Sequence, residues 1–130
     1  MLADKEQAMI RVRIPMRLPS LNEYTAKCRI SKGTWNAGND MKRKTQDALF
    51  PFLLRIPQFK KPIKIHFLWH EKNRKRDLDN VSFAKKFILD AMQECGRIPN
   101  DNSRYILGFT DEAVYDNTYG VELFIEEDKR

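Results

Sequence analysis

The chain has 130 residues, of which 42% are hydrophobic and 32% charged, and its formal net charge is +6. These values predict one soluble globular domain and exclude wholesale disorder. No apolar run approaches the roughly 20 residues of a membrane span, and residues 1–7 lack the apolar block of a signal peptide, so we expect a cytoplasmic protein with no membrane partner. Cys28 and Cys95 form no CxxC pattern and are expected to be reduced, packed thiols.

The first half of the chain contains one clear strand and one clear helix. Residues 10–16 alternate apolar and charged side chains, which predicts a half-buried strand. In the turn that follows, Ser20 or Asn22 could cap a helix. Residues 31–39, with two glycines, predict a flexible loop. Residues 40–55 have helical spacing, and Pro51 is expected to kink that helix or end it early.

The second half adds three strands and the clearest helix. Residues 61–70 predict a strand with an apolar face made by alternate side chains. Residues 79–94 predict a helix that ends near Gly96. Residues 105–109 and 119–126 predict two further strands. The order β-α-β-α-β-β predicts an α/β (α+β) fold: a single domain over residues 1–130, with a mixed sheet flanked by helices.

The charge is distributed unevenly along the sequence. Residues 1–104 hold 22 Lys and Arg against 11 Asp and Glu, whereas residues 105–130 hold 2 against 7. The densest basic stretch runs from residue 60 to residue 76. Such a field attracts a polyanion, although many basic faces are only solvated. The residues we expect to contact DNA are Lys42, Arg43, Lys44, Lys72, Arg74, Lys75 and Arg76.

Two carboxylates stand at the end of this basic stretch, in the sequence Arg76-Asp77-Leu78-Asp79-Asn80. In an extended segment Asp77 and Asp79 would point to the same side. Paired carboxylates suit Mg²⁺, which prefers oxygen ligands and is completed by water and phosphate. The alternative is that Asp79 only caps the next helix and Asp77 is a surface turn residue.

Two further residues could complete such a site. Lys86 follows Asp79 by seven residues, which on a continuous helix places both on about the same side. Its ammonium could contact a scissile phosphate, or it is simply solvated. Asp101 lies in a polar turn that a sheet could return to Asp77 and Asp79, although an Asn-Asp-Asn turn is usually only a turn.

Other constellations are weaker. His66 and His70 share a predicted strand face but stand roughly 13 Å apart, too far for one metal. Trp35, Trp69 and Tyr24 could stack on unpaired bases, although aromatics in a small domain mostly belong to the core. The chain has no P-loop, Rossmann glycine pattern or zinc spacing, so no small-molecule cofactor is expected.

Together these residues resemble the RusA family of Holliday-junction resolvases. Arg76-Asp77-x-Asp79-Asn80, then Lys86, Asp90-Ala91-Met92, Gly96 and Asn100-Asp101, is similar to that family's R-D-x-D-N, K, D-A-L, G and D-D signature. Leu18-Pro19-Ser20-Leu21-Asn22-Glu23-Tyr24 is similar to its P-P-S-x-N-x-Y opening. The departures are about three extra residues between Asn80 and Lys86, and Asn-Asp in place of Asp-Asp.

The resemblance implies a homodimeric, Mg²⁺-dependent endonuclease that nicks opposed strands of a four-way DNA junction in recombination and repair. Asp77, Asp79 and Asp101 would be the catalytic and metal-binding triad. Lys86 would be the catalytic lysine rather than Lys85, because it precedes Asp90 by four residues. Such small resolvases are often prophage-borne.

Two rivals remain open. One is a non-catalytic DNA- or RNA-binding protein on the same scaffold. The other is a protein-interaction module whose acidic C-terminal part docks a basic partner. The presence of all three aspartates favours the nuclease over both, because binding to phosphate alone would gain from their replacement.

Overall fold

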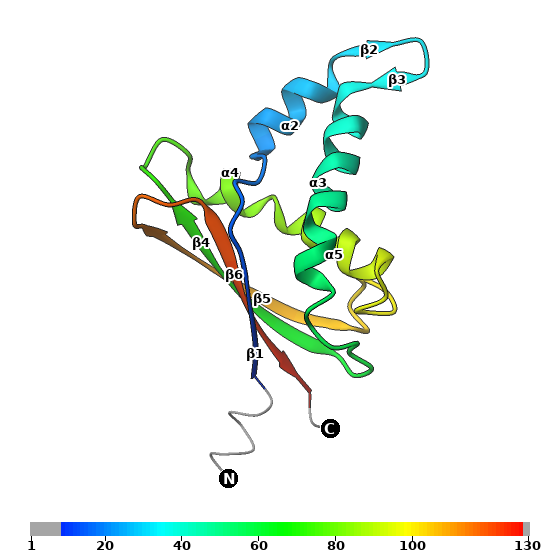
Figure 1. Cartoon of the computed structure of the whole chain (residues 1–130), viewed down its shortest axis with the longest axis vertical. Coiled ribbons are helices and arrows are strands. Elements are labelled where there is room, and N and C mark those ends of the chain that lie inside the picture. Colours follow the sequence, from blue (N-terminus) through cyan, green and yellow to red (C-terminus); the bar gives the residue numbers. More distant parts are fainter. Residues whose placement is uncertain (1–8, 129–130) are drawn as a thin grey trace.

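Alternating apolar residues build a four-stranded sheet in the computed structural model, which describes residues 9–128 (Figure 1). Its strands are β1 (Met9–Ile14), β4 (Ile63–Glu71), β5 (Ile106–Tyr115) and β6 (Gly120–Glu127). Their order is β1-β6-β4-β5; β4 and β5 are parallel, and the other two neighbouring pairs are antiparallel. The predicted α+β fold with a mixed sheet is confirmed.

One face of this sheet forms the floor of the core. On β4 the predicted alternation holds, and Ile63, Ile65, Phe67 and Trp69 are buried. Their neighbours on β6 are Val121, Leu123 and Ile125, all fully buried. Because side chains alternate across a strand, every second residue faces the helices, which gives a continuous apolar layer.

Three helices cover this layer: α3 (Ala37–Leu53), α4 (Leu78–Ser82) and α5 (Lys85–Glu94); a fourth, α2 (Leu21–Cys28), packs against α3 and α4 and has no buried residue. Helix α3 contributes Leu49 and Leu53 to the core, and α5 contributes Phe87, Ile88 and Met92. Figure 1 shows α2 and α3 leading away from the sheet to a small hairpin formed by β2 (Ser31–Lys32) and β3 (Trp35–Asn36). Within residues 9–128, none of the helices has the length and apolarity needed to cross a bilayer.

The hairpin corrects the prediction of a flexible loop over residues 31–39. Gly33 turns the chain with a φ of +62°, a conformation that glycine adopts without strain. Asn36 then caps α3 by accepting hydrogen bonds from the amides of Gly38 and Asn39. The helix therefore begins at Ala37, earlier than predicted, and it continues past Pro51 to Leu53.

The helix predicted over residues 79–94 is in fact two helices. Between α4 and α5 the amide of Ala84 bonds to the carbonyl of Val81, and that of Lys86 bonds to Phe83. These bonds span three residues instead of four, so the chain tightens there and the two helices separate. Asp79 and Lys86 therefore do not lie on one continuous helix, and the prediction that this helix places them on the same side is wrong. Strand β5 is also longer than predicted and reaches Tyr115.

The opposite face of the sheet carries a polar network. Glu122 on β6 is buried and accepts hydrogen bonds from Arg11 (2.7 Å) and Arg13 (3.2 Å) on β1. The ring of His70 on β4 lies between Glu122, at 2.7 Å, and Asp116, at 2.6 Å. Although burial opposes ionisation of Glu122, its bonds to His70 and Arg11 lower its pKa. Three strands and the β5–β6 turn are thereby joined on a face that no helix covers.

A capping box opens α2 and supplies a pH-dependent contribution to stability. Ser20 accepts a hydrogen bond from the amide of Glu23, and the Glu23 carboxylate accepts one from the amide of Ser20. Burial opposes ionisation of Glu23, but hydrogen bonds from Arg17 and Ser20 prevail and lower its pKa to about 2.

We predict that the Glu23→Gln variant loses less stability on acidification than the wild type does. A carboxyl whose pKa is depressed in the fold stabilises above its unfolded pKa, and this contribution is lost as the pH falls toward 2. Glutamine keeps a capping-box acceptor but does not titrate. Urea midpoints measured between pH 6 and 2.5 should therefore fall less in the variant than in the wild type; equal falls would contradict the prediction.

Candidate nuclease site

The loop between β4 and α4 is fixed by a buried ion pair. Glu71 ends β4 with its carboxylate buried, and Arg76 binds it with two hydrogen bonds of 2.8 and 2.6 Å. The same guanidinium donates to the carbonyl of Leu18 and to Glu23. A buried carboxylate needs such a partner, because an isolated charge is costly away from water. Arg76 thus holds the loop in place immediately before Asp77.

Arg76 differs in this respect from a DNA-gripping cation. Its side chain is only 12% exposed, and its nitrogen donors face protein acceptors on β4, on α2 and in the loop between β1 and α2. The expectation that it contacts DNA does not fit this packing, because the guanidinium is already committed. We assign it instead to positioning the first turn of α4.

That turn presents two exposed carboxylates that have no structural partner. Asp77 occupies the capping position of α4, yet its side chain makes no capping hydrogen bond. Asp79 is the second residue of the helix. Neither carboxylate has a hydrogen bond or ion pair to any described residue, whereas those of Asp40, Asp47, Glu71, Asp90, Glu94 and Asp111 are all paired. The capping alternative for Asp79 therefore fails, because Asp77 takes the cap position; Asp77 itself is an exposed residue where the loop ends, and the predicted extended geometry is replaced by a helix start.

The middle of α4 is fixed to the rest of the fold. Asn80 accepts a hydrogen bond from the amide of Asn22 at the start of α2, at 2.9 Å. Helix α4 also contacts β4 and β5. The two aspartates are thus carried on an anchored turn, the arrangement that a ligand-binding carboxylate pair needs.

Lys86 lies in a second charged group, with two of the other acidic residues. Its ammonium is 3.2 Å from Asp90 and 3.6 Å from Asp101. Asp90 also accepts from Lys42 at 3.1 Å. The hydrogen bond to Asp90 raises the pKa of Lys86, against the opposing effect of burial, so this lysine stays charged at neutral pH. Asp90, four residues after Lys86 on α5, is thus its ion-pair partner.

The structure also separates Lys86 from Lys85. Lys85 forms an ion pair with Asp111 on β5, and its ammonium lies over the rings of Phe67 and Phe109. Asp111 is bonded in turn to the Trp69 indole. Lys85 is therefore packed against the sheet, whereas the side chain of Lys86 is 57% exposed. Of the two, Lys86 is the more exposed, although it is paired with Asp90 and Asp101.

The arrangement of possible ligands limits which of the described residues could hold the predicted metal together. Among residues 9–128, no three or more His, Cys, Asp or Glu side chains, the set Asp77, Asp79 and Asp101 included, are grouped so that they could hold a metal ion. A site with all three aspartates as ligands thus stays a prediction. Asp77 and Asp79 alone fit the usual Mg²⁺ setting of one or two carboxylates completed by water and phosphate.

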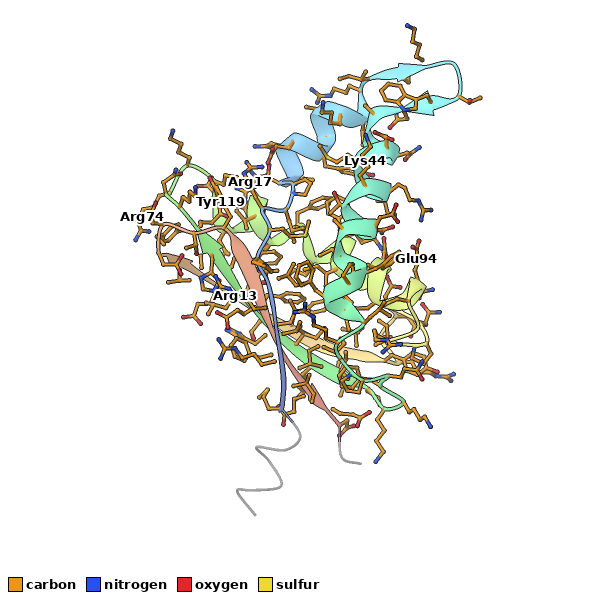
Figure 2. The ribbon with its side chains drawn as sticks, viewed as in Figure 1. Arg13, Arg17, Lys44, Arg74, Glu94 and Tyr119 are labelled. Atoms are coloured by element: carbon orange, nitrogen blue, oxygen red, sulfur yellow. The ribbon has the colours of Figure 1, made fainter. Side chains whose placement is uncertain are left out.

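The remaining predicted DNA contacts differ in how open they are. Lys72 lies over the ring of Tyr119 and Arg74 over that of Tyr115, both in the loop that leads to α4. Figure 2 shows Arg74, Arg17 and Tyr119 gathered in this region. Lys75 is exposed. On α3, Lys44 pairs with Asp40, and Arg43 pairs with Asp47 and Glu94, all within exposed contacts that are weak in water.

Sequence reasoning missed several residues that shape this region. Arg17 joins Lys72 at the Tyr119 ring: the Arg17 guanidinium lies 5.4 Å from the centre of that ring. The bridging role of His70 was also not predicted. Only the acidic residues around it, brought together by strand pairing, give it that role, and no local pattern marks them.

Comparison with protein-family models and with curated proteins gives no match to this chain. The resemblance to RusA-type resolvases therefore rests on the residues themselves.

Proposed function

We propose that the protein is a Mg²⁺-dependent endonuclease that resolves four-way DNA junctions. The observation that carries the proposal is the pair Asp77 and Asp79: two exposed carboxylates on an anchored turn, with no partner among the described residues. Two exposed carboxylates without protein partners, carried on one anchored turn, suit Mg²⁺, which is commonly held by one or two carboxylates with water and phosphate completing its shell. The structural alternative for Asp79 is the role of an acidic residue in the first turn of α4, where a negative charge is favourable to the helix dipole.

Each residue of the proposed site has a separate role. Asp77 and Asp79 would hold Mg²⁺, which supplies Lewis-acid stabilisation and water activation for phosphodiester hydrolysis. Lys86 stabilises negative charge that develops on the phosphate. Asp101 and Asp90 orient the Lys86 ammonium, and Arg76 positions the turn that carries the aspartates. Lys72, Arg74 and Lys75 bind the DNA backbone beside the site.

The non-catalytic DNA- or RNA-binding alternative explains the basic loop but not the aspartates. A purely phosphate-binding surface loses affinity from two unpaired negative charges beside its lysines. A nuclease accounts for the two carboxylates, because they would hold the Mg²⁺ that cleavage needs. In the same proposal the protein acts in the cytoplasm as a homodimer in recombination and repair, with two equivalent sites that meet the near two-fold symmetry of a junction.

We expect the dimer to prefer four-way junctions to linear duplex by about 100-fold, because two fixed surfaces engage together only on branched DNA. Competition binding with and without Mg²⁺, followed by mapping of the nicks, tests both binding and cleavage. Light scattering under the same conditions gives the oligomeric state. A monomer, or equal competition by linear duplex, would favour a general nucleic-acid binder.

A further inference from the structure

The β2–β3 hairpin stands at one end of the molecule, away from the sheet, together with the end of α2 (Figure 1). We refer to residues 27–36 as the arm. Its short strands pair Ser31 with Asn36 and Lys32 with Trp35. None of the ten residues of the arm belongs to the hydrophobic core. Packing of the core therefore does not explain the side chains that the arm exposes.

The arm is held firmly. The amide of Ala37 donates to the carbonyl of Ile30 at 2.9 Å, and the Asn36 side-chain amide donates to the carbonyl of Cys28 at 3.0 Å. The backbone of Gly38 lies against Cys28 so closely that a Cβ there would overlap the sulfur. Helices α2 and α3 thus grip both ends of the arm, which presents its outer side chains in a fixed arrangement.

Those side chains are basic and aromatic. Trp35 is 47% exposed, and Ile30 is 50% exposed. Lys27, Arg29 and Lys32 are exposed and have no ion pair or side-chain hydrogen bond to any described residue. The sequence contains no Asp or Glu between Glu23 and Asp40. Free cations beside an exposed indole suit nucleic acid, in which phosphates attract the charges and bases stack on the ring.

We propose that the arm binds DNA at a branch point, with Trp35 stacked on a base face that branching exposes and the three cations on the flanking phosphates. An internal stretch of duplex offers no such face. The arm begins where α2 ends, and α2 starts at the contact with α4. The eight residues of α2 span about 12 Å, which is the length of a few nucleotides of a DNA strand. The arm and the two aspartates can therefore contact the same DNA molecule.

This inference rests on the proposed function only in taking DNA as the partner, and fluorescence tests it without cleavage. The chain has two tryptophans, and Trp69 is 2% exposed within the core, so Trp35 carries the response to ligand. The protein, in EDTA, is titrated with a four-way junction and with linear duplex whose ends are closed by hairpin loops. We expect quenching by the junction and little by the closed duplex.

Variants assign the signal. Trp35→Ala should abolish the quenching and weaken junction binding by about 10-fold, while binding to closed duplex changes little. Trp35→Phe should abolish the signal but keep most of the affinity, because phenylalanine also stacks; it guards against a folding defect in the alanine variant. Lys32→Ala should weaken binding to both DNAs and reduce the salt dependence by about one ion.

Any of the following results would overturn the proposal. The first is equal quenching by closed duplex and junction. The second is a response of Trp35 to anionic lipid vesicles but not to DNA. The third is dissociation of a dimer by Trp35→Ala with no quenching by DNA, which would make the arm a contact between protomers. Junction cleavage with an unresponsive Trp35 would remove this proposal alone, whereas quenching without cleavage would remove only the nuclease.

Discussion

Asp79→Asn is expected to reduce junction cleavage by about 10³-fold and to leave junction binding equal or tighter. The substitution keeps the shape of the side chain but removes one negative charge and one ligand for a hard cation. Loss of one electrostatic stabiliser of a transition state typically costs 10²–10³ in rate, and loss of the metal stands at the upper end. Single-turnover cleavage of a labelled junction gives the rate, and binding without Mg²⁺ gives the affinity.

Glu126→Gln is the matched control for this experiment. Glu126 is also an exposed carboxylate with no partner among the described residues, but it stands near the end of β6 on the face away from the helices. It therefore reports the effect of removing one surface charge from a +6 chain. Cleavage should persist in Glu126→Gln. Wild-type cleavage by Asp79→Asn, by contrast, would reduce Asp79 to an ordinary first-turn acid of α4.

The sequence predicted the sheet well, because a strand buried on one face alternates apolar and polar residues, and this alternation can be read directly from the sequence. Strands β1, β4 and β6 each alternate, and all three lie where they were expected. The end of β5 was missed because residues 110–115 are mostly polar or half-buried on an edge strand, so no alternation marks them. The hairpin was missed because strands of two residues are too short to show a period.

The charge pattern along the chain proved a poorer guide to the site. Two acidic residues of the C-terminal part are paired with lysine or arginine from earlier in the chain: Asp111 with Lys85, and Glu122 with Arg11 and Arg13. These pairs join strands and helices that are remote in sequence, so linear charge counts cannot show which cations remain free. This pairing also weakens the alternative of an acidic C-terminal docking module, because several of its charges already have partners.

The largest difference between neighbouring residues is expected at Lys85 and Lys86. We predict that Lys86→Met lowers the rate of junction cleavage by about 10²-fold with little change in stability. Methionine keeps much of the apolar stem and the helix propensity of lysine but removes the charge. Because Lys86 is exposed and its pKa is raised by Asp90, its charge is available to a phosphate throughout the neutral range.

Lys85→Met should give the opposite result. This change leaves Asp111 without its cation in a partly buried pair, retaining only the bond from Trp69, which we expect to cost about 1–3 kcal/mol of stability. Below the unfolding temperature its cleavage rate should stay near that of the wild type. Urea unfolding and single-turnover cleavage of both variants separate the two roles. If Lys85→Met instead lost cleavage while Lys86→Met kept it, the catalytic lysine would be Lys85, and the charged group around Asp90 and Asp101 would be structural.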